Sequence, residues 1–213
     1  MSVPVLIADD HPLFRAAMVQ AISTQIGPEI YQADDFEQAR QVLRQTPRIE
    51  LVFLDLNMPG ADGLAGIAGL VTEFPDVQIV VVSAQEDPAV IHRSKTMGIT
   101  GFIPKSTPLA EITRAVECIL QGHDWYPANL PDSELSDEAS QFTQRLTLLT
   151  PHQYKVLSML ANGLLNKQIA FELSISESTV KQHVSAVLKK LHLNNRTQAG
   201  VLFNQLLGKR SAG

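Results

Sequence analysis

The sequence predicts an α/β domain built on a doubly wound parallel sheet of five strands, followed by a small all-α domain. Three observations predict this organisation. Up to about residue 122, short apolar runs rich in β-branched side chains alternate with longer segments of helical periodicity. An acidic stretch that is poor in large apolar residues then interrupts the pattern. Beyond that stretch only helical periodicity remains, with connections of a few residues.

Five short apolar runs indicate buried strands, because polar residues bound each run and strand-favouring side chains fill it. The alternation of these runs with helical segments predicts a parallel sheet with helices on both faces. Five strands fit the flavodoxin-like order, in which ligands bind at the carboxyl ends of the strands. The runs lie near residues 4–8, 29–33, 51–54, 78–83 and 101–104.

Five longer segments are predicted to be helices. Apolar residues in the first and the last of them recur at the i, i+3, i+4 spacing of a buried helix face. Pro12, Pro88 and Pro108 stand near helix starts, where a missing N–H loses no hydrogen bond. The segments lie near residues 12–25, 36–45, 64–74, 88–97 and 108–121.

The rest of the chain is predicted to form a linker and a compact helical domain. We place the first domain at residues 1–124, the linker at 125–146 with a short helix near 136–145, and the helical domain at 147–213. The run Thr150-Pro151-His152-Gln153 predicts a capping box at the start of a helix. The helices of this domain are predicted near residues 151–162, 166–173, 177–191 and 196–207.

Charge is distributed unevenly along the 213 residues. The net charge of −5 combines about −8 for residues 1–127, −3 for 128–145 and +6 for 146–213. A basic C-terminal third behind an acidic body favours nucleic-acid binding at one end, although a solvated basic surface would show the same charge. The chain has no apolar run that could span a bilayer, and Cys118 is its only cysteine. We therefore expect a cytoplasmic protein without a membrane partner.

Polar residues suited to phosphoryl chemistry follow four of the predicted strands. Asp9 and Asp10 follow the first run, and Asp55 follows the third. Ser83 ends the fourth run, and Lys105 follows the fifth. Because the carboxyl ends of parallel strands share one edge of the sheet, these groups are expected to meet in one crevice. Carboxylates there can bind Mg²⁺, which cancels the repulsion between an aspartate and a phosphoryl group.

Residues 3–122 resemble a response-regulator receiver domain. The resemblance is carried by Asp9-Asp10, Asp55-Leu56-Asn57-Met58-Pro59-Gly60, Ser83-Ala84 and Lys105. It implies that Asp55 is the nucleophile and forms an aspartyl phosphate. It also implies that Lys105 pairs with Asp55 at rest and with the phosphoryl group afterwards, while Ser83 donates a hydrogen bond to that group.

The resemblance further implies a Mg²⁺ site and a switch residue. Asp10 and Asp55 are the expected side-chain ligands of Mg²⁺, and the backbone carbonyl of Asn57 supplies a further oxygen. Asp9 is expected to act directly or through a metal-bound water. Phe102 occupies the position of an aromatic residue that swings inward when Ser83 moves, although it also fits an ordinary core position.

Residues 148–207 resemble the LuxR-type helix-turn-helix domain of the NarL/FixJ subfamily of two-component response regulators. The matching residues form an almost continuous series. They are Leu149-Thr150-Pro151, Gly163-Leu164-Leu165-Asn166-Lys167-Gln168-Ile169-Ala170, Leu173-Ser174-Ile175-Ser176-Glu177-Ser178-Thr179-Val180-Lys181-Gln182-His183-Val184, Leu188-Lys189-Lys190-Leu191, Asn195-Arg196-Thr197 and Ala199.

One helix of this domain has the pattern of a major-groove reading helix. Ser176 is its predicted N-cap, and a polar face lies apart from its apolar stripe. Lys181, Gln182 and Ser185 of that face are predicted to approach base edges. His183 is predicted to pack at a helix interface. The predicted phosphate contacts are Lys167, Ser178, Thr179, Lys189, Lys190 and Arg196.

Together these features predict a DNA-binding response regulator. A sensor histidine kinase is expected to phosphorylate Asp55 with Mg²⁺, and phosphorylation is expected to control promoter binding as a homodimer, and hence transcription. One alternative is a Mg²⁺-dependent phosphohydrolase, but Asn57 stands where such an enzyme would have a second carboxylate. We therefore expect no catalysis beyond the receiver's own phosphorylation and dephosphorylation. A second alternative is a DNA-binding protein whose receiver only docks.

Overall fold

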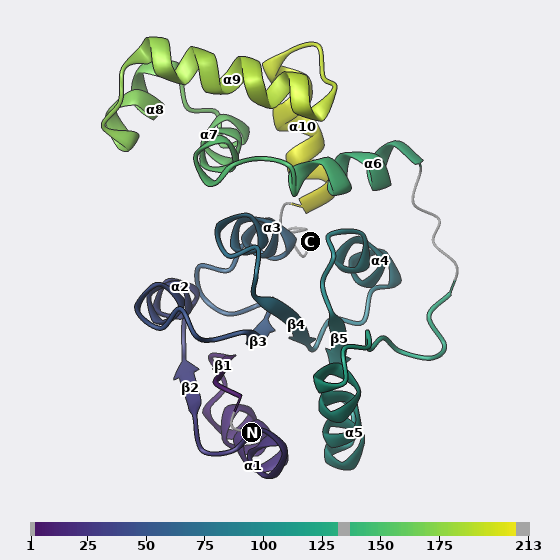
Figure 1. Ribbon diagram of the computed structural model, residues 1–213. Helices are drawn as coiled ribbons and strands as arrows, with labels where there is room; N and C mark the ends of the chain where they lie inside the picture. Colours follow the sequence, from purple (N-terminus) through teal and green to yellow (C-terminus); the bar gives the residue numbers. More distant parts are fainter. Residues whose placement is uncertain (1–2, 132–136, 208–213) are drawn as a thin grey trace. The chain divides into compact units, whose positions relative to one another are not determined.

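The computed structural model describes residues 3–131 and 137–207 (Figure 1). The N-terminal part contains the predicted parallel five-stranded sheet, in the order β2-β1-β3-β4-β5. This order confirms the flavodoxin-like prediction. The strands are β1 (Val5–Ala8), β2 (Ile30–Ala33), β3 (Leu51–Asp55), β4 (Gln78–Ser83) and β5 (Gly101–Pro104).

The register of the sheet brings the strand ends together. Ala8 of β1 pairs with Leu54 of β3, so Asp9 and Asp55 follow neighbouring residues. Ser83, the last residue of β4, pairs with Pro104, which ends β5. The polar residues at these strand ends therefore lie along one edge of the sheet, as predicted.

Helices connect successive strands, and each boundary lies within one residue of the predicted one. Figure 1 shows α1 and α5 on one side of the sheet, and α2 and α4 on the other. Alternate strand residues such as Ile7, Phe53 and Val82 form one buried cluster with residues of α1 and α5. The helices are α1 (Pro12–Ile26), α2 (Phe36–Gln45), α3 (Leu64–Glu73), α4 (Pro88–Thr96) and α5 (Leu109–Leu120).

The segment after α5 differs from the predicted linker. Trp125 forms a parallel β-bridge with Gly101 of β5 and packs against the core of the sheet domain. The hydroxyl of Tyr126 donates a hydrogen bond to the carbonyl of Ile99. We call residues 124–131 the strap. Its first residues are thus part of the sheet domain, and the predicted linker start at residue 125 is too early.

The predicted linker helix is present as α6 (Asp137–Leu146), one residue later than expected. It belongs to the helical part of the chain, because it contacts α9 (Glu177–Leu191). The guanidinium of Arg145 lies 3.4 Å from the carbonyl oxygen of Leu191, to which it donates a hydrogen bond. Most of the predicted linker is therefore held by one domain or the other, and residues 132–136 lie outside the described residues.

The C-terminal part forms the predicted small helical domain. Val156 and Leu160 of α7 pack with Ile169 of α8 and Val180 of α9 in its core. Thr150 caps α7, and the reciprocal contacts with Gln153 complete the predicted capping box. The remaining helices are α7 (Pro151–Ala161), α8 (Asn166–Leu173) and α10 (Arg196–Leu207). None of the helices in the described ranges is both long and apolar enough to cross a bilayer.

Candidate functional site

An acidic cluster with one ammonium lies at the carboxyl edge of the sheet. Asp9 and Asp55 are almost fully buried, with 2% and 1% of each residue exposed. The Lys105 Nζ lies 2.7 Å from Asp9 Oδ2 and 2.8 Å from Asp55 Oδ2. Two buried carboxylates are costly without a counter-charge, so this ammonium stabilises the cluster. Lys105 is therefore the resting partner of Asp55, as the sequence predicts.

The protonation of Lys105 is well defined by its surroundings. Burial lowers its pKa, but hydrogen bonds and charges from Asp55 and Asp9 outweigh this effect and raise the pKa above 10.5. A group whose pKa is raised on folding stabilises the folded state below its unfolded pKa and ceases to do so above its folded pKa. The stabilisation from this ammonium is therefore present throughout neutral pH and is lost only in strong base.

Ser83 lies on β4, which pairs with Asp55's strand β3, and Phe102 lies on β5, the strand beyond β4; both residues are fully buried. The Ser83 hydroxyl accepts a hydrogen bond from the backbone N–H of Gln85, and the Ser83 carbonyl accepts one from the backbone N–H of Lys105. β4 and the end of β5 are thus directly connected at the site. The burial of Phe102 fits both a core residue and an inward switch position.

Asn57 helps to hold the Asp55 carboxylate in place. Its backbone N–H donates a hydrogen bond of 3.0 Å to Asp55 Oδ1. Asp55 therefore has one oxygen held by the following turn and the other by Lys105. Such fixed contacts orient a carboxylate for attack along one direction.

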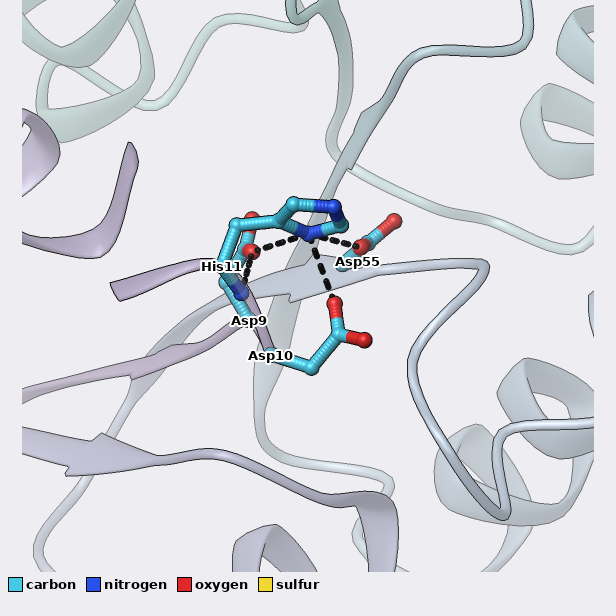
Figure 2. A group of neighbouring side chains, drawn as sticks. All are labelled: Asp9, Asp10, His11 and Asp55. Atoms are coloured by element: carbon cyan, nitrogen blue, oxygen red, sulfur yellow. Dashed lines mark hydrogen bonds and ion pairs between the residues drawn. The ribbon is translucent and has the colours of Figure 1, made fainter. Parts of the chain in front are cut away.

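His11 is a member of the cluster that sequence reasoning missed. In Figure 2 its Nδ1 faces the three carboxylates, 2.7 Å from Asp10 Oδ1, 3.2 Å from Asp9 Oδ1 and 3.9 Å from Asp55 Oδ2. The only sequence signal was its position directly after the acidic pair. The imidazole therefore contacts the same carboxylates that the resemblance to receiver domains implies as Mg²⁺ ligands.

The donor set of this cluster suits a divalent cation. Ligand atoms of Asp9, Asp10, His11 and Asp55 all lie within 4.8 Å of one another. Asp10 Oδ1 is buried, and its partner among the described residues is the His11 Nδ1 at 2.7 Å. Carboxylates are preferred ligands of hard divalent ions, so this group can hold one.

A second candidate site is the exposed face of α9. Lys181, Gln182, Ser185 and Lys189 are all exposed on this helix, as predicted. The helix begins at the predicted cap, where the Ser176 Oγ accepts a hydrogen bond from the backbone N–H of Thr179. A helix N-terminus with a polar, uncovered face can approach base edges and phosphates.

The predicted DNA-contacting residues around this face differ in exposure and in whether their side chains already have partners within the domain. Lys167 is exposed on α8, and His183 stacks on His152 of α7, as its predicted packing role requires. The hydroxyls of Ser178 and Thr179 lie 2.6 Å and 2.8 Å from the Ser176 Oγ. These two side chains therefore take part in the cap as well as standing at the start of the helix.

Lys190 and Arg196 have partners inside the domain. The Lys190 ammonium donates hydrogen bonds of 2.8 Å to the Leu148 carbonyl and to Gln153 Oε1. The Arg196 guanidinium donates to the Leu164 carbonyl at 2.9 Å. Both residues therefore connect segments of the helical domain through hydrogen bonds. Their contact with DNA phosphates stays a prediction.

Comparison with known proteins covers both sites. Residues 5–117 match the family model of the response regulator receiver domain, and residues 147–203 match that of the bacterial regulatory proteins of the luxR family. The chain is 41% identical to the glycerol metabolism activator of Pseudomonas putida over 203 residues, or 92% of each chain. It is 32% identical to the nitrate/nitrite response regulator NarL of Escherichia coli K12 over 94% of each chain.

Solved structures share the fold. RcsB of Salmonella typhimurium aligns with a TM-score of 0.56 at 22% identity, covering 96% of this chain and 98% of RcsB. A complex of RcsB with DNA aligns with the same TM-score at 21% identity, covering 97% and 100%. With the family models and the close relatives, this places the chain among the response regulators that join an N-terminal receiver domain to a C-terminal helix-turn-helix domain of the luxR family.

Proposed function

We propose that this protein is a transcription regulator whose DNA binding is controlled by phosphorylation of Asp55. The observation that carries the proposal is the buried Asp55 carboxylate, held by Lys105 at 2.8 Å and by the Asn57 N–H at 3.0 Å. A sensor histidine kinase is the expected phosphodonor. An Asp55 oxygen attacks the phosphorus, the bond from phosphorus to the kinase imidazole breaks, and Asp55 becomes an aspartyl phosphate.

The neighbouring groups have distinct roles in this step. The Lys105 ammonium passes from the Asp55 carboxylate to an oxygen of the phosphoryl group, and the Ser83 hydroxyl donates to another. Phosphorylation adds about −1.5 to −2 charges at the site. We infer that Ser83 and Phe102 respond to this charge, because Ser83 ends the strand that pairs with Asp55's strand and Phe102 lies on β5, which leads into Lys105.

We propose Mg²⁺ as the cation of the acidic cluster. Asp9, Asp10, Asp55 and the backbone carbonyl of Asn57 would hold it, and it would neutralise the repulsion between Asp55 and the phosphoryl oxygens. The fit rests on the carboxylate donor set, whose ligand atoms lie within 4.8 Å of one another.

Lys105→Met is expected to tighten Mg²⁺ binding by about tenfold, because it removes a like charge that lies within 3 Å of two proposed ligands. Isothermal titration of the full chain with Mg²⁺ measures this. Lys155→Met removes the same charge from an exposed position of α7 and should leave the affinity unchanged. Equal affinities for the Lys105 variant and the wild type would exclude Asp9 and Asp55 as ligands.

Double-stranded promoter DNA is the proposed target, bound by a homodimer in the cytoplasm. A basic domain with an exposed polar reading helix supports DNA as the ligand. A solved structure with this fold is described as two RcsB dimers bound to DNA. Two copies of α9 would then contact two half-sites of one operator.

The proposal includes no turnover of other phosphate compounds. Asn57 stands two residues after Asp55, where a phosphohydrolase of this chemistry would have a general acid/base carboxylate. An amide cannot take up and return the proton of a leaving group. Repeated turnover of a small phosphoester by the purified chain would contradict this part of the proposal.

Selection of bound duplexes from a random DNA pool tests the function as a whole. Run with and without beryllofluoride and Mg²⁺, it should enrich one sequence class, and at least about tenfold more strongly with the phosphoryl mimic, given a coupling of 1 to 3 kcal/mol. Equal enrichment and equal oligomeric state in both runs would favour a receiver that only docks. Enrichment of no sequence would reject a sequence-specific regulator.

A further inference from the structure

The strap extends the sheet beyond its last strand. β5 is an edge strand, since it pairs only with β4 in the sheet. The backbone N–H of Trp125 donates a hydrogen bond of 3.0 Å to the Thr100 carbonyl, and the Trp125 carbonyl accepts one of 2.8 Å from the backbone N–H of Phe102. The strap therefore binds the free side of β5 through main-chain hydrogen bonds on both sides of Gly101.

Side chains fasten the strap at two further points. The Tyr126 hydroxyl donates to the Ile99 carbonyl, and the Lys95 ammonium lies 5.3 Å above the Tyr126 ring. Burial, with the charge of Asp124, raises the pKa of Tyr126, so its hydroxyl keeps the proton it donates. Further along, the His92 Nε2 donates a 2.7 Å hydrogen bond to the Pro131 carbonyl. Because Lys95 and His92 belong to α4, the strap connects β5 with α4.

The fit between strap and β5 is tight. A Cβ added at Gly101 would lie 3.1 Å from the Trp125 carbonyl oxygen and 3.3 Å from a methyl of Ile119. Such a contact leaves little room for β5 to shift without the strap. Phe102, which responds to phosphorylation together with Ser83 in the proposed function, donates its backbone N–H to the Trp125 carbonyl of the strap. A movement of Phe102 therefore acts on the strap directly.

We propose that the strap is the output contact of the receiver: its docking on β5 and α4 differs between the resting and the phosphorylated states of Asp55. This inference rests on the proposed function and adds the segment that reads the switch. The strap leads along the chain into α6, which is hydrogen-bonded to the C-terminal end of α9 through Arg145 and the Leu191 carbonyl. The strap is thus hydrogen-bonded to β5, and α6, which follows it in the sequence, is hydrogen-bonded to α9.

Trp125 makes the proposal directly measurable, because it is the only tryptophan of the chain. Beryllofluoride with Mg²⁺ should change the emission maximum of the full chain and alter its quenching by iodide about twofold or more, as expected when a partly buried ring changes its contacts. The Asp55→Asn variant should show neither change. The fluorine NMR signal of bound beryllofluoride reports occupancy of the site independently of the tryptophan.

The two measurements separate the two ideas. Bound beryllofluoride without any change at Trp125 would overturn the strap as output contact and leave the proposed function intact. Absence of bound beryllofluoride would overturn the proposed function itself, and with it the role of the strap.

A reciprocal test uses the fact that coupling between two equilibria acts in both directions. Tyr126→Phe removes the hydroxyl that holds the strap on Ile99. If phosphorylation loosens the strap, this variant should bind beryllofluoride about two- to tenfold more tightly, the range of one net hydrogen bond. Tyr31→Phe removes a similar hydroxyl contact, to Arg48, on the opposite edge strand β2 and should have no effect. Equal affinities for wild type and both variants would show that the strap is indifferent to the site.

Discussion

Asp55→Asn is expected to lose phosphoryl transfer by about a hundredfold or more, because a neutral amide is not a nucleophile toward phosphorus. The side chain keeps its size and can still accept the hydrogen bond that Asn57 donates to Asp55. The fold should therefore survive. Incubation with a phosphorylated sensor kinase or a small acyl phosphate, followed by intact mass measurement, detects the added phosphoryl group.

A matched control is available on the same domain. Asp76 is an exposed aspartate in the loop before β4, and Asp76→Asn makes the same chemical change without touching the cluster. This control should be labelled like the wild type. Full labelling of Asp55→Asn would mean that another residue is the nucleophile, and the assignment of the carboxylate cluster would have to change.

Replacing Lys181 and Gln182 together by alanine is expected to reduce binding to the selected operator by about ten- to a thousandfold, since one well-placed base contact contributes about 1 to 3 kcal/mol of discrimination. Both side chains are exposed on α9, so the domain core should be unaffected. Binding to unrelated duplexes should fall much less, because phosphate contacts remain. Fluorescence anisotropy with the operator and a scrambled duplex measures both affinities.

Charge alone is controlled by Lys155→Ala. Lys155 is an exposed lysine of α7 that is not on the α9 face, so its loss should change operator and scrambled affinities by similar small factors. If the double variant weakened both duplexes equally, the two residues would be phosphate contacts and another part of the domain would read the bases.

Much of the fold follows from local patterns in the sequence. The run Leu51-Val52-Phe53-Leu54 is apolar throughout because both faces of β3 are covered, and the change to Asp55 marks where the strand reaches the sheet edge. Thr150 and Ser176 predict the starts of α7 and α9, because each side chain accepts a hydrogen bond from a backbone N–H in the first turn of its helix. These signals depend on neighbours in the chain, which a single sequence contains.

The features that could not be predicted depend on contacts between distant segments. The direction of the His11 ring is set by Asp10 beside it and by Lys105, 94 residues away. The hydrogen bond of 2.8 Å from the Lys190 ammonium to the Leu148 carbonyl joins residues 42 positions apart, and no local pattern predicts it. The strap carries Pro127 and Pro131, which are typical of a loop, and Trp125 finds its backbone partners only on the unpaired side of β5.

The strap also determines at which residue a soluble fragment of the receiver domain can end. A fragment ending at residue 124 would leave the Phe102 N–H and the Thr100 carbonyl without their partners, on an apolar strand open to water. Such a strand recruits strands from other molecules and leads to aggregation. A fragment that continues through residue 131 would keep the edge closed by its own chain. The solubility of the receiver, and not only its signalling, therefore depends on residues that follow its last helix.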